Sequence, residues 1–182
     1  MSAETDRRQR FEAIAADVFD PLQRYLRRRA RSADADDALS EVLMTVWRRL
    51  DDAPADHVLP WAYGIARRVL ANQRRGQDRH LRLVEKMESE PGPRHSPDPA
   101  DLGPDPELTA ALEQLPDDDR EVLRLWAWEQ LEPREIAPVL DISVNAATLR
   151  LSRARKKLAD SLSRQDSASD GHEWVEGTQE SR

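Results

Sequence analysis

The basic residues of segment 144–158, VNAATLRLSRARKKL, have the types and spacing expected of a DNA-reading helix. The segment carries five basic side chains and no acidic one. A helix with this concentration of positive charge binds phosphates, and the side chains near its N-terminus can reach base edges. The segment therefore predicts a helix that lies in the major groove of a duplex.

This helix has a docking side and a free side. Apolar residues on one side recur at the spacing that docks a helix on its neighbours, namely Ala147, Leu151, Ala154 and Leu158. The residues that we expect at the DNA are Ser143, Val144, Asn145, Thr148, Leu149, Arg150, Ser152, Arg153 and Lys156. Asn145 suits adenine and Leu149 suits a thymine methyl group, each adding about 1–3 kcal/mol of discrimination. The alternative is that an exposed leucine is simply tolerated here.

A second helical segment, PREIAPVL, precedes this one and is separated from it by a short turn from Asp141 to Ser143. Two helices joined in this way have helix-turn-helix spacing. Aspartate tolerates the left-handed backbone that such a turn requires. Pro138 would cost about 3 kcal/mol in a helix interior, and the sequence alone offers no compensation for it.

The positions of the prolines divide the chain into modules. Six of the twelve prolines lie between residues 91 and 106, where neither a helix nor a sheet can persist. We expect residues 86–106 to be a flexible linker between a block at 8–85 and a block at 107–163, each large enough for three or four helices. The polar residues 164–182 are expected to be disordered. The predicted fold is all-α, with two small helical domains joined by an acidic, proline-rich linker.

The first block shows helical spacing of apolar residues over three segments, approximately 11–26, 35–50 and 61–70. Pro21 predicts a kink in the first helix, and Ser32 or Asp34 is a candidate cap for the second. The third helix is expected to start near Pro60 or Trp61 and to bury Trp61 in the core. The arginines that it leaves on its outer and C-terminal surfaces are Arg67, Arg68, Arg74 and Arg75.

The charge and the composition exclude several classes of protein. The formal net charge is -7, but residues 85–119 alone contribute -9, so the rest of the chain is slightly basic. Without cysteine there is no disulfide framework, zinc knuckle or thiol nucleophile. The four histidines are scattered singly, so we expect neither an enzyme nor a metal or cofactor. No apolar run is long enough for a membrane span, which predicts a cytoplasmic protein.

Together the two halves resemble the extracytoplasmic-function sigma factors, from about Phe11 to Leu162 apart from the linker. The first block corresponds to region two of that family and the last block to region four, where VLDISVNAATLRLSRARKKL resembles the reader of the minus-thirty-five element. The resemblance implies a protein that binds RNA polymerase core and directs promoter recognition, DNA melting and transcription initiation. Its implied partners are the polymerase clamp and promoter DNA, as duplex and as non-template single strand.

The segment DADDALSEVLMTVWRRL resembles the helix of the family that binds the polymerase clamp. The resemblance implies a contact face made of Asp37, Ser40, Glu41, Met44 and Arg48. Ser40 departs from the family, whose members usually carry glutamine there. Without the resemblance, the same residues would be interpreted as a solvated helix face.

The segment WAYGIARRVLANQRRG is similar to the family segment that approaches the minus-ten element. The DNA contacts implied here are Tyr63, Arg67, Arg68, Asn72, Arg74 and Arg75. The loop at 51–58 lies where the family captures a base flipped out of the non-template strand, and Asp56 and His57 would line that pocket. An ordinary solvated loop is the alternative for these two residues.

Two further hypotheses remain at this point. A free-standing helix-turn-helix regulator would bind sequence-specific DNA as the purified chain alone, whereas a sigma factor needs core polymerase. The two halves could also serve an anti-sigma factor that sequesters them, since the family often has such partners.

Overall fold

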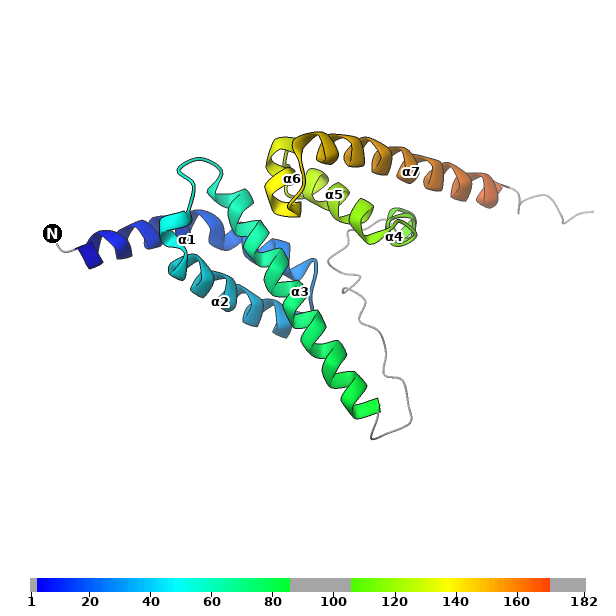
Figure 1. Cartoon of the computed structure of the whole chain (residues 1–182). Coiled ribbons are helices and arrows are strands. Elements are labelled where there is room, and N and C mark those ends of the chain that lie inside the picture. The colour runs from blue at the N-terminus through cyan, green and yellow to red at the C-terminus, as the bar shows by residue number, and fades with distance from the viewer. Residues whose placement is uncertain (1–2, 86–105, 171–182) are drawn as a thin grey trace, which may run out of the picture.

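The computed structural model describes residues 3–85 and 106–170, and Figure 1 shows their arrangement. Within these ranges the regular elements are α-helices and one short 3-10 helix, so the predicted all-α fold is confirmed. The elements are α1 (Ala3–Arg27), α2 (Ser32–Arg48), η1 (Leu50–Asp52), α3 (Val58–Glu85), α4 (Pro106–Glu113), α5 (Asp117–Ala127), α6 (Pro133–Leu140) and α7 (Val144–Asp170). The expected linker lies outside the described residues except for Pro106, which begins α4.

Helices α1, α2 and α3 form the first module, in which each helix packs against the other two. Its core consists of the apolar residues that recur at helical spacing in the sequence. Side chains that are completely enclosed there are Val18, Leu22, Tyr25, Leu26, Val42, Val46 and Leu50. The three amphipathic patterns therefore converge on one shared core.

The ends of these helices differ from the sequence-based expectations. α1 begins at Ala3, ahead of residue 8, and continues through Pro21. α2 begins at Ser32, and its N-cap is Arg31, where no side chain forms a capping hydrogen bond. Neither Ser32 nor Asp34 is therefore the cap of this helix. α3 begins at Val58, which places Pro60 in the first turn, where its missing N–H costs no helical hydrogen bond.

Helices α4 to α7 form the second module, and α7 packs against the other three helices. Arg120 joins the first two helices of this module. Its guanidinium donates hydrogen bonds of 2.9 Å to the carbonyl oxygens of Leu112, Glu113 and Leu115 at the end of α4. The Leu112 carbonyl oxygen also accepts a hydrogen bond of 3.2 Å from the backbone N–H of Leu115, and Arg120 adds partners for the carbonyls at and just beyond the end of α4.

The helix-turn-helix consists of α6 and α7, as predicted. Asp141 adopts the left-handed conformation at φ 58° and ψ 47°, which lets the chain reverse between the two helices. The hydroxyl of Ser143 then accepts a hydrogen bond from the backbone N–H of Ala146 at 3.2 Å and caps the start of α7. Pro138 lies inside α6, which nevertheless continues to Leu140 and packs against both α3 and α7.

α7 extends further than the sequence analysis expected. The helix continues to Asp170, so the disordered tail predicted from residue 164 is wrong for residues 164–170. The helix can continue past residue 163 because residues 164–170 contain neither glycine nor proline. Gly171 is the first residue after Leu162 whose type disfavours a helix. Residues 171–182, including Trp174, lie outside the described residues. Among the helices described, none has an apolar stretch that could cross a bilayer.

Candidate nucleic-acid and partner interfaces

The predicted DNA face of α7 is exposed, and the opposite stripe is buried. Ala147 and Ala154 have no exposed area, Leu151 is buried and Leu158 is partly buried against the core. On the other side, 55% of the Leu149 surface and 49% of the Val144 surface are open to solvent. Other exposed residues of this face are Ser143, Asn145, Thr148, Ser152, Arg153 and Lys156. The rotational position of the helix is therefore the one that the spacing predicted.

The basic side chains of α7 differ in what they contact. Arg150 is half-buried and forms an ion pair with Asp118 of α5, with 3.3 Å between Nη1 and Oδ2. Lys157 pairs with Asp119, and Arg155 stacks on the ring of Trp126 at 4.8 Å. These contacts commit part of the positive charge to the module itself. Within the described part of the chain, the basic residues of this helix face that have no ion pair are Arg153 and Lys156.

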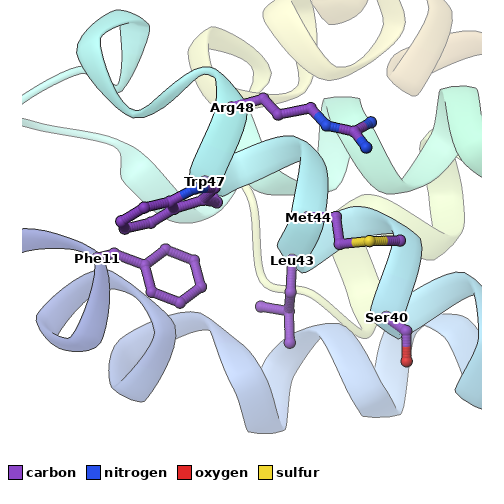
Figure 2. Close-up of a pocket in the computed structure, with 6 residues that line it drawn as sticks. All are labelled: Phe11, Ser40, Leu43, Met44, Trp47 and Arg48. Atoms are coloured by element: carbon purple, nitrogen blue, oxygen red, sulfur yellow. The ribbon is translucent and has the colours of Figure 1, made fainter. Parts of the chain in front are cut away.

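On α2, three of the predicted contact residues, Ser40, Met44 and Arg48, line an apolar groove of about 500 Å³ (Figure 2). Met44 is 51% exposed, and Asp37, Ser40 and Arg48 are exposed while Glu41 is half-buried. The groove is lined by Phe11, Ser40, Leu43, Met44, Trp47 and Arg48. An exposed methionine beside half-buried aromatic rings makes an adaptable apolar surface with a charged rim.

Three lining residues of this groove were not among the predicted contacts, namely Phe11, Leu43 and Trp47. The ring of Phe11 in α1 meets Trp47 edge-on, with 5.3 Å between the ring centroids. Arg7 lies over the same indole and donates a hydrogen bond of 2.8 Å to the Trp47 carbonyl oxygen. The start of α1 is thus held against the end of α2. The signal in the sequence is that Leu43 and Trp47 lie beside the apolar stripe that includes Val42 and Val46.

The polar residues predicted on α3 lie mostly at its surface. Arg68, Asn72, Arg74 and Arg75 are exposed, and Arg67 is half-buried. Arg75 donates a hydrogen bond of 2.6 Å to the Asn72 side chain, and Arg74 donates one of 3.1 Å to the carbonyl oxygen of Arg29. This surface is basic, as a DNA-facing helix requires.

Tyr63 departs from that pattern, because only 2% of its surface is exposed. Its ring packs on Tyr25 of α1, with 4.9 Å between the centroids. Burial raises the pKa of its phenol, and the nearby carboxylate of Glu129 raises it further. In this arrangement Tyr63 presents almost no surface to solvent, and its contact with DNA stays a prediction. The next residue, Gly64, faces the backbone of α6.

The loop before α3 also faces α6. Asp56 and His57 are exposed, as a base-capturing pocket would need. His57 has a left-handed backbone, with φ of 66°, and its Nδ1 lies 3.5 Å from the Glu135 carboxylate. Trp61, expected in the core, is partly buried and packs against it.

Two parts of the chain match known protein families. Residues 16–80 match the sigma-70 region 2 family, and residues 106–158 match the sigma-70 region 4 family. The chain is also 33% identical, over 171 residues, to the RNA polymerase sigma factor CarQ of Myxococcus xanthus. That match covers 85% of this chain and 94% of CarQ.

Two solved structures have a similar fold. One is the sigma factor RpoE in complex with the anti-sigma factor NepR from Bartonella quintana, with a TM-score of 0.64 and 21% identity. It covers 84% of this chain and 96% of that one. The other is CnrH in complex with the cytosolic domain of CnrY, with a TM-score of 0.58, 24% identity and coverage of 85% and 88%. The chain belongs to the RNA polymerase sigma factors of the extracytoplasmic-function type, which direct promoter recognition.

Proposed function

We propose that the exposed face of α2 docks on the clamp of core RNA polymerase. Met44 and the apolar groove supply contact area, while Asp37 and Arg48 supply charges that fix the orientation. The observation that carries this proposal is the unusual exposure of Met44 beside half-buried Phe11 and Trp47. Large apolar side chains that cluster on a surface indicate a partner.

The DNA contacts divide between the two modules. α7 reads the minus-thirty-five element through Asn145 and Leu149, while Arg153 and Lys156 hold phosphates. The basic surface of α3 receives the minus-ten element, and the loop with Asp56 and His57 holds a base of the displaced non-template strand. Residues 86–106 link the two modules and set the span between them. Melting is driven by binding energy alone, so the chain itself catalyses no reaction.

An anti-sigma factor is a further proposed partner. The two similar structures, of RpoE with NepR and of CnrH with CnrY, are both complexes with a second protein. The groove on α2 suits such a partner, because it combines exposed apolar area with charge. A partner seated there would exclude the polymerase clamp.

Substitution in the groove tests the clamp contact. Met44→Glu places a charge in the apolar groove and should weaken binding to core polymerase by at least about tenfold. Phe19→Glu is a matched control, because Phe19 is a 40% exposed apolar residue of the same module outside the groove. Fluorescence anisotropy with core enzyme measures both affinities. Equal affinities for the two variants would show that the groove is not the docking surface.

A second experiment separates a sigma factor from a free-standing regulator. The purified chain and the chain with core polymerase are each titrated with a promoter duplex. We expect specific binding and transcripts with core polymerase, and only weak, salt-sensitive binding by the chain alone. Tight specific binding by the chain alone, with no association with core enzyme, would support the regulator instead.

A further inference from the structure

The loop that leads into α3 is held at its start by the first turns of α1. Arg7 donates a hydrogen bond of 2.9 Å to the Asp51 carboxylate, in η1, and one of 2.8 Å to the Trp47 carbonyl oxygen. Arg10 donates one of 3.1 Å to the carbonyl oxygen of Ala53, the residue that follows η1. These bonds join residues that are 40 to 44 positions apart in the sequence. Two arginines of one helix therefore contact the start of the loop.

Arg7 and Arg10, here termed the brace, lie on one side of α1, because residues three positions apart share a side of a helix. Arg8 lies between them in the sequence and pairs instead with Glu12 of its own helix, at 2.9 Å. Its side chain is 74% exposed. Arg8 is therefore a matched control for the brace, with the same charge and a different contact.

The bonds of the brace to backbone oxygens matter more than its ion pair. The Asp51 side chain is 80% exposed, so water screens its attraction to Arg7. The Trp47 carbonyl lies in the last turn of α2, where the helix dipole favours a cation. The Arg7 guanidinium also lies 5.2 Å from the centroid of the Trp47 ring. A bond to a carbonyl oxygen fixes the path of the chain itself, which a bond to a side chain does not.

Exposure rises along the loop that follows the brace. Leu50 has no exposed area and Ala53 is buried, so the start of the loop belongs to the core of the module. Asp56 and His57 are exposed, and His57 has the left-handed backbone described above. Ala53 lies only a few residues before this exposed pair. Its anchoring by Arg10 consequently limits where the pair can lie.

We propose that Arg7 and Arg10 are positioning residues for promoter opening, which hold the loop where Asp56 and His57 can receive a base. Extruding a base from the stack costs free energy, and the pocket must offset that cost. A loop that is ordered before binding loses less entropy when it holds the base, so more of the binding free energy remains for melting. This inference rests on the proposed function, in which the loop holds a base of the displaced strand.

Three variants separate the brace from general damage to the module. Arg10→Gln removes the bond to Ala53 and leaves the groove on α2 untouched, because Arg10 does not line it. The double variant Arg7→Gln, Arg10→Gln removes the whole brace, including the contact with Trp47 of the groove. Arg8→Gln is the control.

Hydrogen exchange in the full chain without polymerase tests whether the brace holds the loop. The backbone N–H groups of Asp52 and Ala53 donate to the carbonyl oxygens of Arg49 and Leu50 at 2.9 and 3.2 Å, so their exchange reports the opening of η1. In the double variant both should exchange at least about tenfold faster than in the parent, whereas the control keeps the parent rates. The Val46 amide should stay slow in every variant, which shows that α2 is intact. Parent rates at both amides in the double variant would overturn the brace.

The role in base capture is tested with core polymerase present. Fluorescence anisotropy measures the affinity for a labelled non-template single strand of the minus-ten element, in which each base in turn is replaced by an abasic site. In the parent, one replacement should weaken binding most. In Arg10→Gln this penalty should shrink at least about threefold, while the affinity for that abasic strand stays unchanged. Structural damage would instead weaken binding of both strands equally, and the control should keep the parent penalty.

The parent chain distinguishes a failure of this inference from a failure of the proposed function. If the parent shows the penalty and both brace variants keep it in full, Arg7 and Arg10 are not positioning residues and base capture stands. If no abasic position weakens binding of the parent, base capture by the loop is refuted and the positioning role falls with it.

Discussion

The two helices predicted to face DNA differ in how freely they present that face. α7 exposes its predicted face except at Arg150, which is half-buried, and Leu149 and Asn145 are open to solvent. α3 exposes its arginines but packs Tyr63 and Gly64 against the rest of the molecule. The second module thus presents most of its predicted DNA contacts to solvent, whereas the first module keeps one of its predicted contacts, Tyr63, buried.

This difference teaches that helical spacing predicts the packing of a helix within its own module and not its contacts with another module. The apolar stripe of α7 packs on helices that lie close to it in the sequence, so the spacing of its residues predicts which side of α7 is buried. The contact of α3 with the second module depends on Gly64, on the backbone of α6 and on ion pairs between residues of the two modules. None of these has a period in the sequence.

The largest expected effect tests the buried state of Tyr63. Tyr63→Ala should lower the free energy of unfolding by about 3 kcal/mol, because it leaves a cavity beside Tyr25. Urea unfolding followed by circular dichroism measures the change, and Tyr63→Phe, which keeps the ring, is the control. If Tyr63→Ala is as stable as the parent but impairs minus-ten binding, the tyrosine faces DNA and the contrast between the helices disappears.

The next effect concerns base reading by α7. Leu149→Ala and Asn145→Ala should each reduce discrimination at one base pair of the minus-thirty-five element by about 1–3 kcal/mol, without loss of stability. Competition between duplexes that differ at single positions, with polymerase present, measures this discrimination. Asp160→Ala, at an exposed position further along α7, serves as the control. Unchanged discrimination for Leu149→Ala would mean that this exposed leucine is merely tolerated.

A smaller effect is expected from Arg124, whose charge is buried beside that of Arg29. Arg124→Met removes the desolvated cation and should stabilise the chain by about 1 kcal/mol, or roughly 2–4 °C in Tm. Differential scanning calorimetry compares it with Arg27→Met, at an exposed position of α1. A lower Tm would instead show that the stacking of Arg124 on Trp128, at 5.4 Å, outweighs the cost of burial.

The smallest effect distinguishes two arginines of α7. Arg153 is exposed and should hold a phosphate, so Arg153→Ala should reduce the slope of log affinity against log salt concentration by about 1. Arg150→Ala should change the slope less, because Asp118 already pairs with that guanidinium. Titrations of the minus-thirty-five duplex at several salt concentrations, with polymerase present, measure both slopes. Equal changes would mean that the ion pair with Asp118 opens on DNA.

Much of the second module could be predicted from the sequence. The turn at Asp141 follows from the tolerance of aspartate for left-handed geometry, and the docking stripe follows from helical spacing. The end of α7 was placed too early, because polar composition was interpreted as disorder although no residue before Gly171 breaks the helix. Composition measures the tendency to bury apolar area, and extending a helix by a few residues does not depend on such burial.

The remaining features depend on tertiary contacts that no local pattern specifies. The edge-on packing of Phe11 on Trp47 completes the groove, but it joins two helices whose relative position the sequence does not give. The pairing of Arg29 with Glu121 is equally long-range. From the sequence alone, each of these charged residues is expected at the surface, and only the fold shows that they pair.

The surroundings of Trp128 should make its fluorescence sensitive to the contact between the two modules. Its indole lies 5.6 Å from the guanidinium of Arg28 and 5.4 Å from that of Arg124, so residues of both modules surround one chromophore. Indole emission responds to nearby charge and to water. With the remaining tryptophans replaced by phenylalanine, the wavelength and intensity of its emission should therefore report on the contact between the two modules, without any added dye.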